Sequence, residues 1–222
     1  MLDIVVATRN AHKFRELKAL LRVPGIRYHS LAEFPRARPA AERGRTFAEN
    51  AAIKARAAAR ATGCWAIADD SGIEVDALRG APGVRSARFA GRHGDDRANN
   101  DRLLQKLRGR APSQRRARYR CVLALARPGR GVVAVSDGVW EGRIADAPQG
   151  RGGFGYDPIF WLPRLRKTAA QISAAMKNRL SHRAKAASGM RRVLRRVVTS
   201  RAAIRISTAS RTGSSGQKSD PG

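Results

Sequence analysis

The segment Cys64-Trp65-Ala66-Ile67-Ala68-Asp69-Asp70-Ser71-Gly72 determines how the rest of the chain is interpreted. It begins with an apolar run short enough to be a buried strand, and two adjacent carboxylates follow. We expect this acidic pair at the end of the strand, on a loop where Ser71-Gly72 lets the backbone approach a ligand. Paired carboxylates suit Mg²⁺, which prefers oxygen ligands and often shares them with phosphates. An ordinary Asx turn explains the same residues, so the flanking segments must decide.

A strand, a polar loop and a helix are predicted at the start of the chain. Residues 3–7 form an apolar run typical of a buried strand, and apolar residues recur at helical spacing from Phe14 to Leu21. Asn10 is a candidate N-cap for this helix, whose first backbone N–H groups could receive phosphate. Lys13 would add a positive charge there, although a solvated helix lysine explains it equally well.

A second helix is predicted from Thr46 to about Thr62. Thr46-x-x-Glu49 matches a capping box, and Gly63 can end the helix. Capping accounts for both Thr46 and Glu49 without any catalytic role. Lys54 lies on the same helix, slightly more than one turn after Glu49, and a solvated side chain is the ordinary expectation for it.

The second half of the chain alternates helix, strands and loops. A helix is predicted over residues 95–107, and strands over 119–125 and 131–140 are predicted to pair antiparallel. A glycine-rich loop at 150–158 could bring main-chain N–H groups or an aromatic ring to a ligand, although a tight structural loop explains it nearly as well. The last region, capped by Ser173, contains Lys177, His182 and Arg183.

The composition fits one domain or two closely joined lobes. The chain has 222 residues, of which 42% are hydrophobic, and no apolar segment approaches the roughly 18 residues of a membrane helix. No secretory signal is visible. Cys64 and Cys121 lie in apolar surroundings without metal-ligand spacing, as is typical of reduced thiols in a cytosolic protein. We therefore expect a cytoplasmic protein with no membrane association.

Positive charge is concentrated towards the end of the chain. The net charge is +28, and residues 158–219 contain fifteen Lys and Arg but no Asp or Glu. Such a surface favours polyanions, including nucleic acid or a polyphosphate substrate. Residues 199–222 lack any apolar period. We therefore expect a domain over 1–198, followed by a basic, disordered tail over 199–222.

Six short motifs occur in order along residues 2–195. They are Thr8-x-Asn10-x-x-Lys13-x-x-Glu16, Gly44-x-Thr46-Phe47-x-Glu49-Asn50-Ala51-x-x-Lys54-Ala55, Ala68-Asp69-Asp70-Ser71-Gly72, Pro82-Gly83-Val84-x-Ser86-Ala87-Arg88-Phe89, Gly152-Gly153-Phe154-Gly155-Tyr156-Asp157-Pro158-Ile159-Phe160 and Lys177-Asn178-x-x-Ser181-His182-Arg183. Together they resemble the inosine triphosphate pyrophosphatase family, the XTP/dITP diphosphatases that remove non-standard purine nucleotides. Each motif alone carries little information, but six in this order are very specific.

The resemblance implies a fold, an assembly and a reaction. The fold would be α/β, elongated and two-lobed, with a long mixed central β-sheet, flanking helices and an active-site cleft between the lobes. The assembly would be a homodimer. The reaction would be the Mg²⁺-dependent hydrolysis of ITP, dITP or XTP to the monophosphate and pyrophosphate, which cleanses the nucleotide pool. Lysines and Mg²⁺ would supply most of the stabilisation of the charged transition state.

The resemblance also implies which residues act on the polyphosphate. Asp70 would be the proton acceptor and a metal ligand, with Asp69 and Lys54 beside it in the catalytic group. Glu42 would be the second metal ligand. The polyphosphate would be bound by Lys54 together with Thr8, Arg9, Asn10, Ala11, His12 and Lys13.

The later motifs would bind the rest of the nucleotide. Ser71 would contact the substrate, and Phe154 would be available to stack on the base. The base pocket would be lined by Phe154, Gly155, Tyr156 and Asp157. Lys177, His182 and Arg183 would read the purine by donating hydrogen bonds to its 6-oxo group. The same donors would meet the amino group of adenine donor to donor, so ATP is expected to be a poor substrate.

Departures from the family pattern and two alternatives accompany this interpretation. Gln171 and Met176, upstream of Lys177, stand where the family tends to have acidic residues. Ala41-Glu42 stands where the family often has two acidic residues, and Arg85 stands where an aromatic residue is common. A nucleic-acid-binding protein would explain the basic surface, but the sequence has no helix-turn-helix, zinc ligands or interleaved aromatics to support it. A Maf-like nucleotide pyrophosphatase would share the chemistry but not the Ser181-His182-Arg183 ending. The enzyme of the first kind is therefore favoured.

Overall fold

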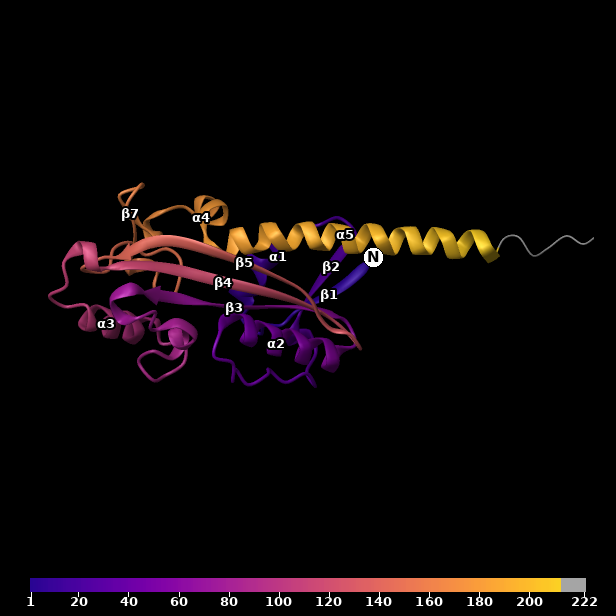
Figure 1. The fold of residues 1–222 in the computed structure, drawn as a ribbon, viewed down its shortest axis with the longest axis horizontal. Coiled ribbons are helices and arrows are strands. Elements are labelled where there is room, and N and C mark those ends of the chain that lie inside the picture. Colours follow the sequence, from indigo (N-terminus) through magenta and orange to yellow (C-terminus); the bar gives the residue numbers. More distant parts are fainter. Residues whose placement is uncertain (213–222) are drawn as a thin grey trace, which may run out of the picture.

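One mixed β-sheet forms the centre of the protein, which is described here from a computed structural model covering residues 1–212. Its strands are β1 (Leu2–Val6), β2 (Ile26–Ser30), β3 (Trp65–Val75), β4 (Arg116–Arg127), β5 (Gly131–Ile144), β6 (Phe160–Leu162) and β7 (Lys167–Thr168). They follow the order β2-β1-β3-β4-β5-β6-β7 (Figure 1). β1 pairs parallel with β2 and β3, and the pairs from β3 to β7 are antiparallel. The predicted α/β fold with a long mixed sheet is confirmed.

Helices cover both faces of this sheet. α1 (Ala11–Leu20) and α5 (His182–Thr212) lie on one face, and α2 (Phe47–Thr62) lies on the other (Figure 1). The other two α-helices, α3 (Asp96–Lys106) and α4 (Ala174–Leu180), lie near the end of the molecule where β7 is found. Of the described helices, none is long and apolar enough to cross a membrane.

The apolar residues of the strands alternate between the two helical layers. Towards α1 and α5, Ile67 and Leu123 pack in a buried cluster with Leu194. Towards α2, Ala66 and Ala124 pack with the alanines of that helix. This alternation follows from the period-two geometry of a strand, and it fixes which side of β3 each later residue faces.

A further buried cluster lies beyond these two, where β3, β4 and β5 continue past the end of β1. It includes Ile73, Leu103, Trp140 and Phe160. β1 pairs with β3 only as far as Ile67, whereas β4 pairs with β3 up to Val75. The long antiparallel strands therefore join two groups of helices. The cleft between the lobes stays a prediction.

The acidic pair lies inside β3, which corrects the expectation of a loop. Asp69 and Asp70 pair with Leu123 and Val122 of β4, and the pairing continues to Val75. The strand continues through these polar residues because its partner β4 is apolar and fully paired there. Glycine at position 72 is required by close packing and not by a turn, since a Cβ there would lie 2.4 Å from Ser86 Oγ.

Capping residues begin the helices where the sequence predicts. Asn10 accepts a hydrogen bond from the backbone N–H of Lys13, and Thr46 accepts one from the N–H of Glu49. Gly63 ends α2 in the left-handed conformation, at φ +68°. The predicted strand–loop–helix start and the capped second helix are confirmed.

The last helix is longer than the sequence suggested. We expected a disordered tail from residue 199, but α5 continues to Thr212. No proline or glycine interrupts the chain between Gly189 and Gly213, and the alanines and arginines there favour a helix. The expectation is therefore corrected for residues 199–212, and the remainder of the predicted tail lies outside the described residues.

Candidate active site

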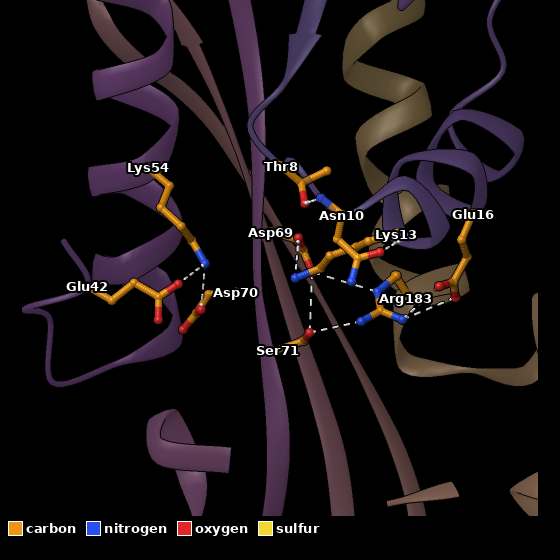
Figure 2. A network of polar contacts seen from close by, with 10 residues as sticks. All are labelled: Thr8, Asn10, Lys13, Glu16, Glu42, Lys54, Asp69, Asp70, Ser71 and Arg183. Atoms are coloured by element: carbon orange, nitrogen blue, oxygen red, sulfur yellow. Dashed lines mark hydrogen bonds and ion pairs between the residues drawn. The ribbon is translucent and has the colours of Figure 1, made fainter. Parts of the chain in front are cut away.

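Asp69 and Asp70 point to opposite faces of β3, because successive side chains on a strand alternate (Figure 2). The side chain of Asp69 faces α1 and α5, and that of Asp70 faces α2. Both are buried, with residue exposures of 4% and 7%. Two adjacent carboxylates therefore lie in two different sets of neighbours, which are described in turn.

On the first face, Asp69 is held by two cations. Its Oδ1 lies 2.9 Å from Lys13 Nζ, and its Oδ2 lies 3.7 Å from Arg183 Nε. Arg183 also donates to both oxygens of Glu16, at 3.1 and 3.0 Å, and to Ser71 Oγ at 3.0 Å. Burial alone would raise the pKa of Asp69, but Lys13 and Arg183 outweigh it and hold the pKa well below its usual range.

The Thr8–Lys13 segment leads from β1 into the first turn of α1 at this face. The backbone N–H of Asn10 donates to Thr8 Oγ1 at 3.2 Å, so the loop is ordered before the helix begins. The N-terminus of α1 and the ammonium group of Lys13 together offer positive charge next to β3, as a phosphate site requires. Lys13 is about a quarter exposed, so it can meet a ligand while it contacts Asp69.

On the second face, one lysine joins two carboxylates. Lys54 Nζ lies 2.7 Å from Asp70 Oδ1 and 2.8 Å from Glu42 Oε1 (Figure 2). Asn50, one turn before Lys54 on α2, donates to Asp70 Oδ2 at 3.3 Å and accepts from the backbone N–H of Gly44 at 2.8 Å. Lys54 does not have the solvated side chain that its helical position alone would suggest, since that side chain is only 13% exposed, and its catalytic role stays a prediction.

The second face leaves Asp70 with a raised pKa. Burial is the main cause, and it outweighs the lowering effect of Lys54. Glu42 and Asp69 raise the pKa of Asp70 further by like-charge repulsion. Lys54 itself stays protonated, because Asp69, Asp70 and Glu42 outweigh its own burial and raise its pKa. A carboxylate with a raised pKa next to a fixed cation can accept a proton from water.

The donor set on this second face fits Mg²⁺. Within the described residues there is no group of three or more histidine, cysteine or acidic side chains that could hold a metal by itself. Mg²⁺ does not need such a group, because it commonly takes one or two carboxylates and completes its shell with water and substrate phosphates. Asp70 and Glu42 supply two such oxygen ligands. The ammonium group of Lys54 contacts both carboxylates, which shows that the space between them favours a cation.

The glycine-rich segment is fixed by contacts with α3 and α4. Gly155 donates its N–H to Asp96 at 2.6 Å and accepts from Asn100 at 3.1 Å. Asp157, fully buried, accepts from the N–H of Phe154 and pairs with Lys177. These contacts leave Phe154 46% exposed as a residue, so its ring can stack on a flat ligand.

Two predicted purine-reading cations lie over that ring. Lys177 Nζ is 4.7 Å and Arg183 Cζ is 5.4 Å from the centroid of Phe154. The structure thus brings the glycine-rich segment together with the final motif, and Arg183 connects both to Asp69. Arg183 already donates to Glu16 and Ser71, so these two residues fix the position of the guanidinium group. Its predicted role in reading the purine would come in addition.

His182 lies deeper than a simple base-reading residue would. Its ring stacks on Tyr119, with centroids 4.6 Å apart and planes 8° apart. Burial, helped by Arg183 and Lys177, places its pKa well below the usual value, so the imidazole is neutral. Its Nδ1 is buried without a hydrogen-bond partner in the described part of the chain. A neutral imidazole can still donate from one ring nitrogen.

Some predicted residues have other partners in the structure. Arg9 donates to the carbonyl of Ala37, His12 contacts Arg15, and Tyr156 donates its hydroxyl to the carbonyl of Ser86. Tyr156 is 5% exposed, and its ring belongs to the core. Ala11 offers only its place in the first turn of α1.

Sequence reasoning missed several residues that contact the site, and three of them contact its charged side chains. They are Glu16, Asn50 and Arg88, which contact Arg183, Asp70 and Glu42 respectively. All three belong to the motifs quoted above, so the motifs could have indicated them. Their partners lie up to 167 positions away in the chain, which no local pattern reveals.

Comparison with known proteins shows which family the chain belongs to. A model of the Ham1 family matches residues 4–193. The dITP/XTP pyrophosphatase of Geobacillus kaustophilus is 52% identical over 186 residues, which cover 84% of this chain and 91% of that protein. The dITP/XTP pyrophosphatase of Thioalkalivibrio sulfidiphilus is 53% identical over 186 residues, which cover 83% of this chain and 94% of that protein.

Solved structures agree as well. A HAM1 protein from Coxiella burnetii superposes with a TM-score of 0.82 at 43% identity, covering 88% of this chain and all of the other. The Ham1 protein of Staphylococcus aureus superposes with a TM-score of 0.79 at 41% identity, covering 87% of this chain and 98% of the other. The chain therefore belongs to the Ham1 family.

Proposed function

We propose that this protein is a nucleoside triphosphate pyrophosphatase that hydrolyses ITP, dITP or XTP to the monophosphate and pyrophosphate, and so removes these nucleotides from the pool. Its relatives named above are dITP/XTP pyrophosphatases. The observation that carries the proposal is the pair Asp69 and Asp70. One carboxylate is kept ionised among cations, and the other, with a raised pKa, lies next to Lys54.

In the proposed mechanism, Asp70 accepts the proton of the attacking water. Water adds to phosphorus, the anhydride bond between the α- and β-phosphates breaks, and the pyrophosphate leaves with the bonding electrons. Lys54 and Lys13 bind the phosphate oxygens, where negative charge is highest in the transition state. Glu42 and Asp70 would hold Mg²⁺, which when bound supplies further positive charge against those oxygens.

The base would bind against Phe154, beside the final motif. Phe154 would stack on the purine, within the segment from Phe154 to Asp157. Lys177, His182 and Arg183 would donate to the 6-oxo group of hypoxanthine or xanthine. Adenine carries an amino group at that position. This group also donates hydrogen bonds, so it could not accept one from Lys177, His182 or Arg183.

We also propose that the protein acts as a homodimer, as the motif resemblance implies, and that it does so in the cytoplasm, as the two thiols in apolar surroundings suggest. Multi-angle light scattering of the purified protein at micromolar concentration should give about twice the chain mass of 24.1 kDa. A single-chain mass would reject the dimer and leave the reaction class unaffected.

The decisive experiment is a pyrophosphate-release assay with ITP, dITP, XTP, GTP and ATP in the presence of Mg²⁺. We expect kcat/KM for ITP and XTP to exceed that for ATP at least about tenfold, which requires only about 1.4 kcal/mol of differential transition-state binding. The same assay with a chelator should abolish release. Equal rates with ATP would reject the specificity, and release of phosphate in place of pyrophosphate would reject the reaction itself.

A further inference from the structure

The motif from Pro82 to Phe89 has no role in the function described so far. It folds as a short 3-10 helix, η3 (Gly83–Arg88), which lies directly on β3. Ser86 Oγ accepts a hydrogen bond from the N–H of Ile73 at 2.9 Å and donates to the carbonyl of Gly83 at 2.6 Å. Because Gly72 has no Cβ, the helix approaches β3 immediately after the acidic pair.

The far side of η3 is fixed as well. Tyr156 donates its hydroxyl to the carbonyl of Ser86 at 2.8 Å. Asn99 of α3 donates to the carbonyl of Ala87 at 3.3 Å and accepts from the N–H of Ala90 at 2.7 Å. The backbone of Arg88 is therefore held from both sides, which is more than a surface arginine requires.

The side chain of Arg88 extends from this fixed backbone to the second face of the site. Its Nη1 lies 3.6 Å from Glu42 Oε2, while the other oxygen of Glu42 contacts Lys54. At 3.6 Å the contact is an ion pair and not a good hydrogen bond. The side chain is 37% exposed, and among the described residues Glu42 is its one ionic partner. Most of its five N–H donors therefore stay available to a ligand.

We propose that Arg88 is a phosphate-binding residue of this site, whose guanidinium group donates to the polyphosphate of the nucleotide beside Lys54. The inference deepens the proposed function and rests on it. An arginine suits this task because its planar donors match phosphate oxygens two at a time. Because Arg88 lies 3.6 Å from Glu42, its N–H donors are not used in a short hydrogen bond to that carboxylate and can bind phosphate oxygens.

Arg85 provides a matched control on the same helix. It lies one turn earlier on η3 and is exposed, and it has no ion pair or side-chain hydrogen bond within the described residues. Replacing either arginine by alanine removes one positive charge from a chain of net charge +28. Any difference between the two variants therefore reflects position and not total charge.

The test is the equilibrium binding of ITP without metal, measured by isothermal titration calorimetry in EDTA and about 150 mM salt. We expect Arg88→Ala to raise the Kd of ITP at least about tenfold, within the range for a lost hydrogen bond to a charged group. Arg88→Lys should fall between wild type and Arg88→Ala, and Arg85→Ala should stay within about twofold of wild type. Equal effects of Arg88→Ala and Arg85→Ala would overturn the proposal.

A double-mutant cycle with Glu42→Gln excludes an indirect effect. If Arg88 only neutralises Glu42, replacing Arg88 by Ala should change the Kd of ITP little in the Glu42→Gln background. If Arg88 binds phosphate itself, the loss of affinity should persist there. Inosine, which has no phosphate, should be bound equally by wild type and Arg88→Ala, and weaker inosine binding would point to a folding defect and overturn the proposal.

The failure of this inference can be distinguished from the failure of the proposed function. A wild-type protein that binds ITP through Arg88 but releases no pyrophosphate would contradict the reaction and leave the phosphate site in place. If the wild-type protein releases pyrophosphate and the Arg88→Ala variant does so with the same kcat/KM, only the role of Arg88 is contradicted.

Discussion

On one face of β3, Asp69 lies against Lys13 and Arg183 and its pKa falls; on the other face, Asp70 lies against Lys54 and Glu42 and its pKa rises. The two carboxylates are adjacent in the chain and similarly buried. The difference comes from their neighbours. Asp69 has two cations within 4 Å, whereas Asp70 shares one cation with another carboxylate.

This comparison shows how one strand can serve two purposes. The ionised Asp69 fixes Lys13 and Arg183, and through them the start of α1 and of α5. Asp70 has fewer compensating charges, so its ionised form is less stable and more ready to take up a proton. Under the proposed function, Asp69 positions its two cations and Asp70 accepts the proton, and each prediction below tests that division of roles.

The largest expected effect is on stability, from Asp69→Asn. Removing this charge leaves Lys13 and the buried Arg183 without their shared partner, and breaking such a pair typically costs about 3–5 kcal/mol. Urea denaturation should therefore show a free energy of unfolding lower by about 3 kcal/mol or more. Asp70→Asn is the control, and it should change the same quantity by no more than about 1 kcal/mol, because burial already disfavours its ionised form.

The pH dependence of stability should separate the same two residues. The folded-state pKa of Asp69 is lowered, so its stabilisation is present above an unfolded pKa of about 3.9 and is lost as the pH falls towards the folded value. Asp69→Asn should remove this part of the acid sensitivity. If the free energy of unfolding of wild type and of Asp69→Asn falls by the same amount as the pH is lowered, Asp69 is not the ionised residue that stabilises the first face.

The next effect is on catalysis, from Asp70→Asn. The change keeps the shape of the side chain but removes the proton acceptor and one candidate Mg²⁺ ligand. We expect kcat for pyrophosphate release from ITP to fall at least about a hundredfold, the low end for losing a general base. Circular dichroism should confirm that the variant is folded. A folded variant with full activity would show that Asp70 is not the proton acceptor.

A smaller effect is expected on the pH profile, from Lys54→Met. Lys54 lowers the pKa of Asp70, so without it the burial of Asp70 is less compensated and that pKa should rise further. The acidic limb of the kcat profile should move to higher pH by about one unit, the low end for an adjacent opposite charge. An unchanged limb in a variant that remains active would show that another group sets it.

The smallest effect is expected from Asn50→Ala, which removes the hydrogen bond that the Asn50 amide donates to the Asp70 carboxylate at 3.3 Å. Because this bond is long, it should contribute at the low end for a bond to a charged group, about 1.5 kcal/mol, so kcat should fall about tenfold. Steady-state assays with ITP measure it. A loss as large as that of Asp70→Asn would mean that Asn50 contacts the reacting groups directly.

Local patterns predicted much of the fold. The helix starts at Asn10 and Thr46, the end of α2 at Gly63 and the antiparallel pairing of β4 with β5 were all visible in the sequence. These features depend on capping, glycine conformation and strand period, which act over a few residues. The order of the six motifs also indicated which segments would meet at the site.

Features that depend on distant partners could not be predicted in this way. β3 continues through Asp69 and Asp70 because β4, some fifty positions later, supplies the partner strand. The contact of Arg183 with Glu16 spans 167 positions. The sequence prediction ended α5 too early because residues after 198 have no amphipathic period, and only their helix propensity indicates a helix. Tertiary pairing therefore determined what local patterns left open.

Because side chains alternate along β3, the site also depends on whether the number of residues before Asp69 is odd or even. Inserting or deleting one residue between Gly63 and Asp69 would exchange the faces of the two carboxylates, and Asp70 would then lie against Lys13 and Arg183. A change of two residues would preserve the faces but shift the pair along β4. The number of residues that lead into Asp69 therefore matters to the site as well as their identity, since Ala66, Ile67 and Ala68 are buried in the core.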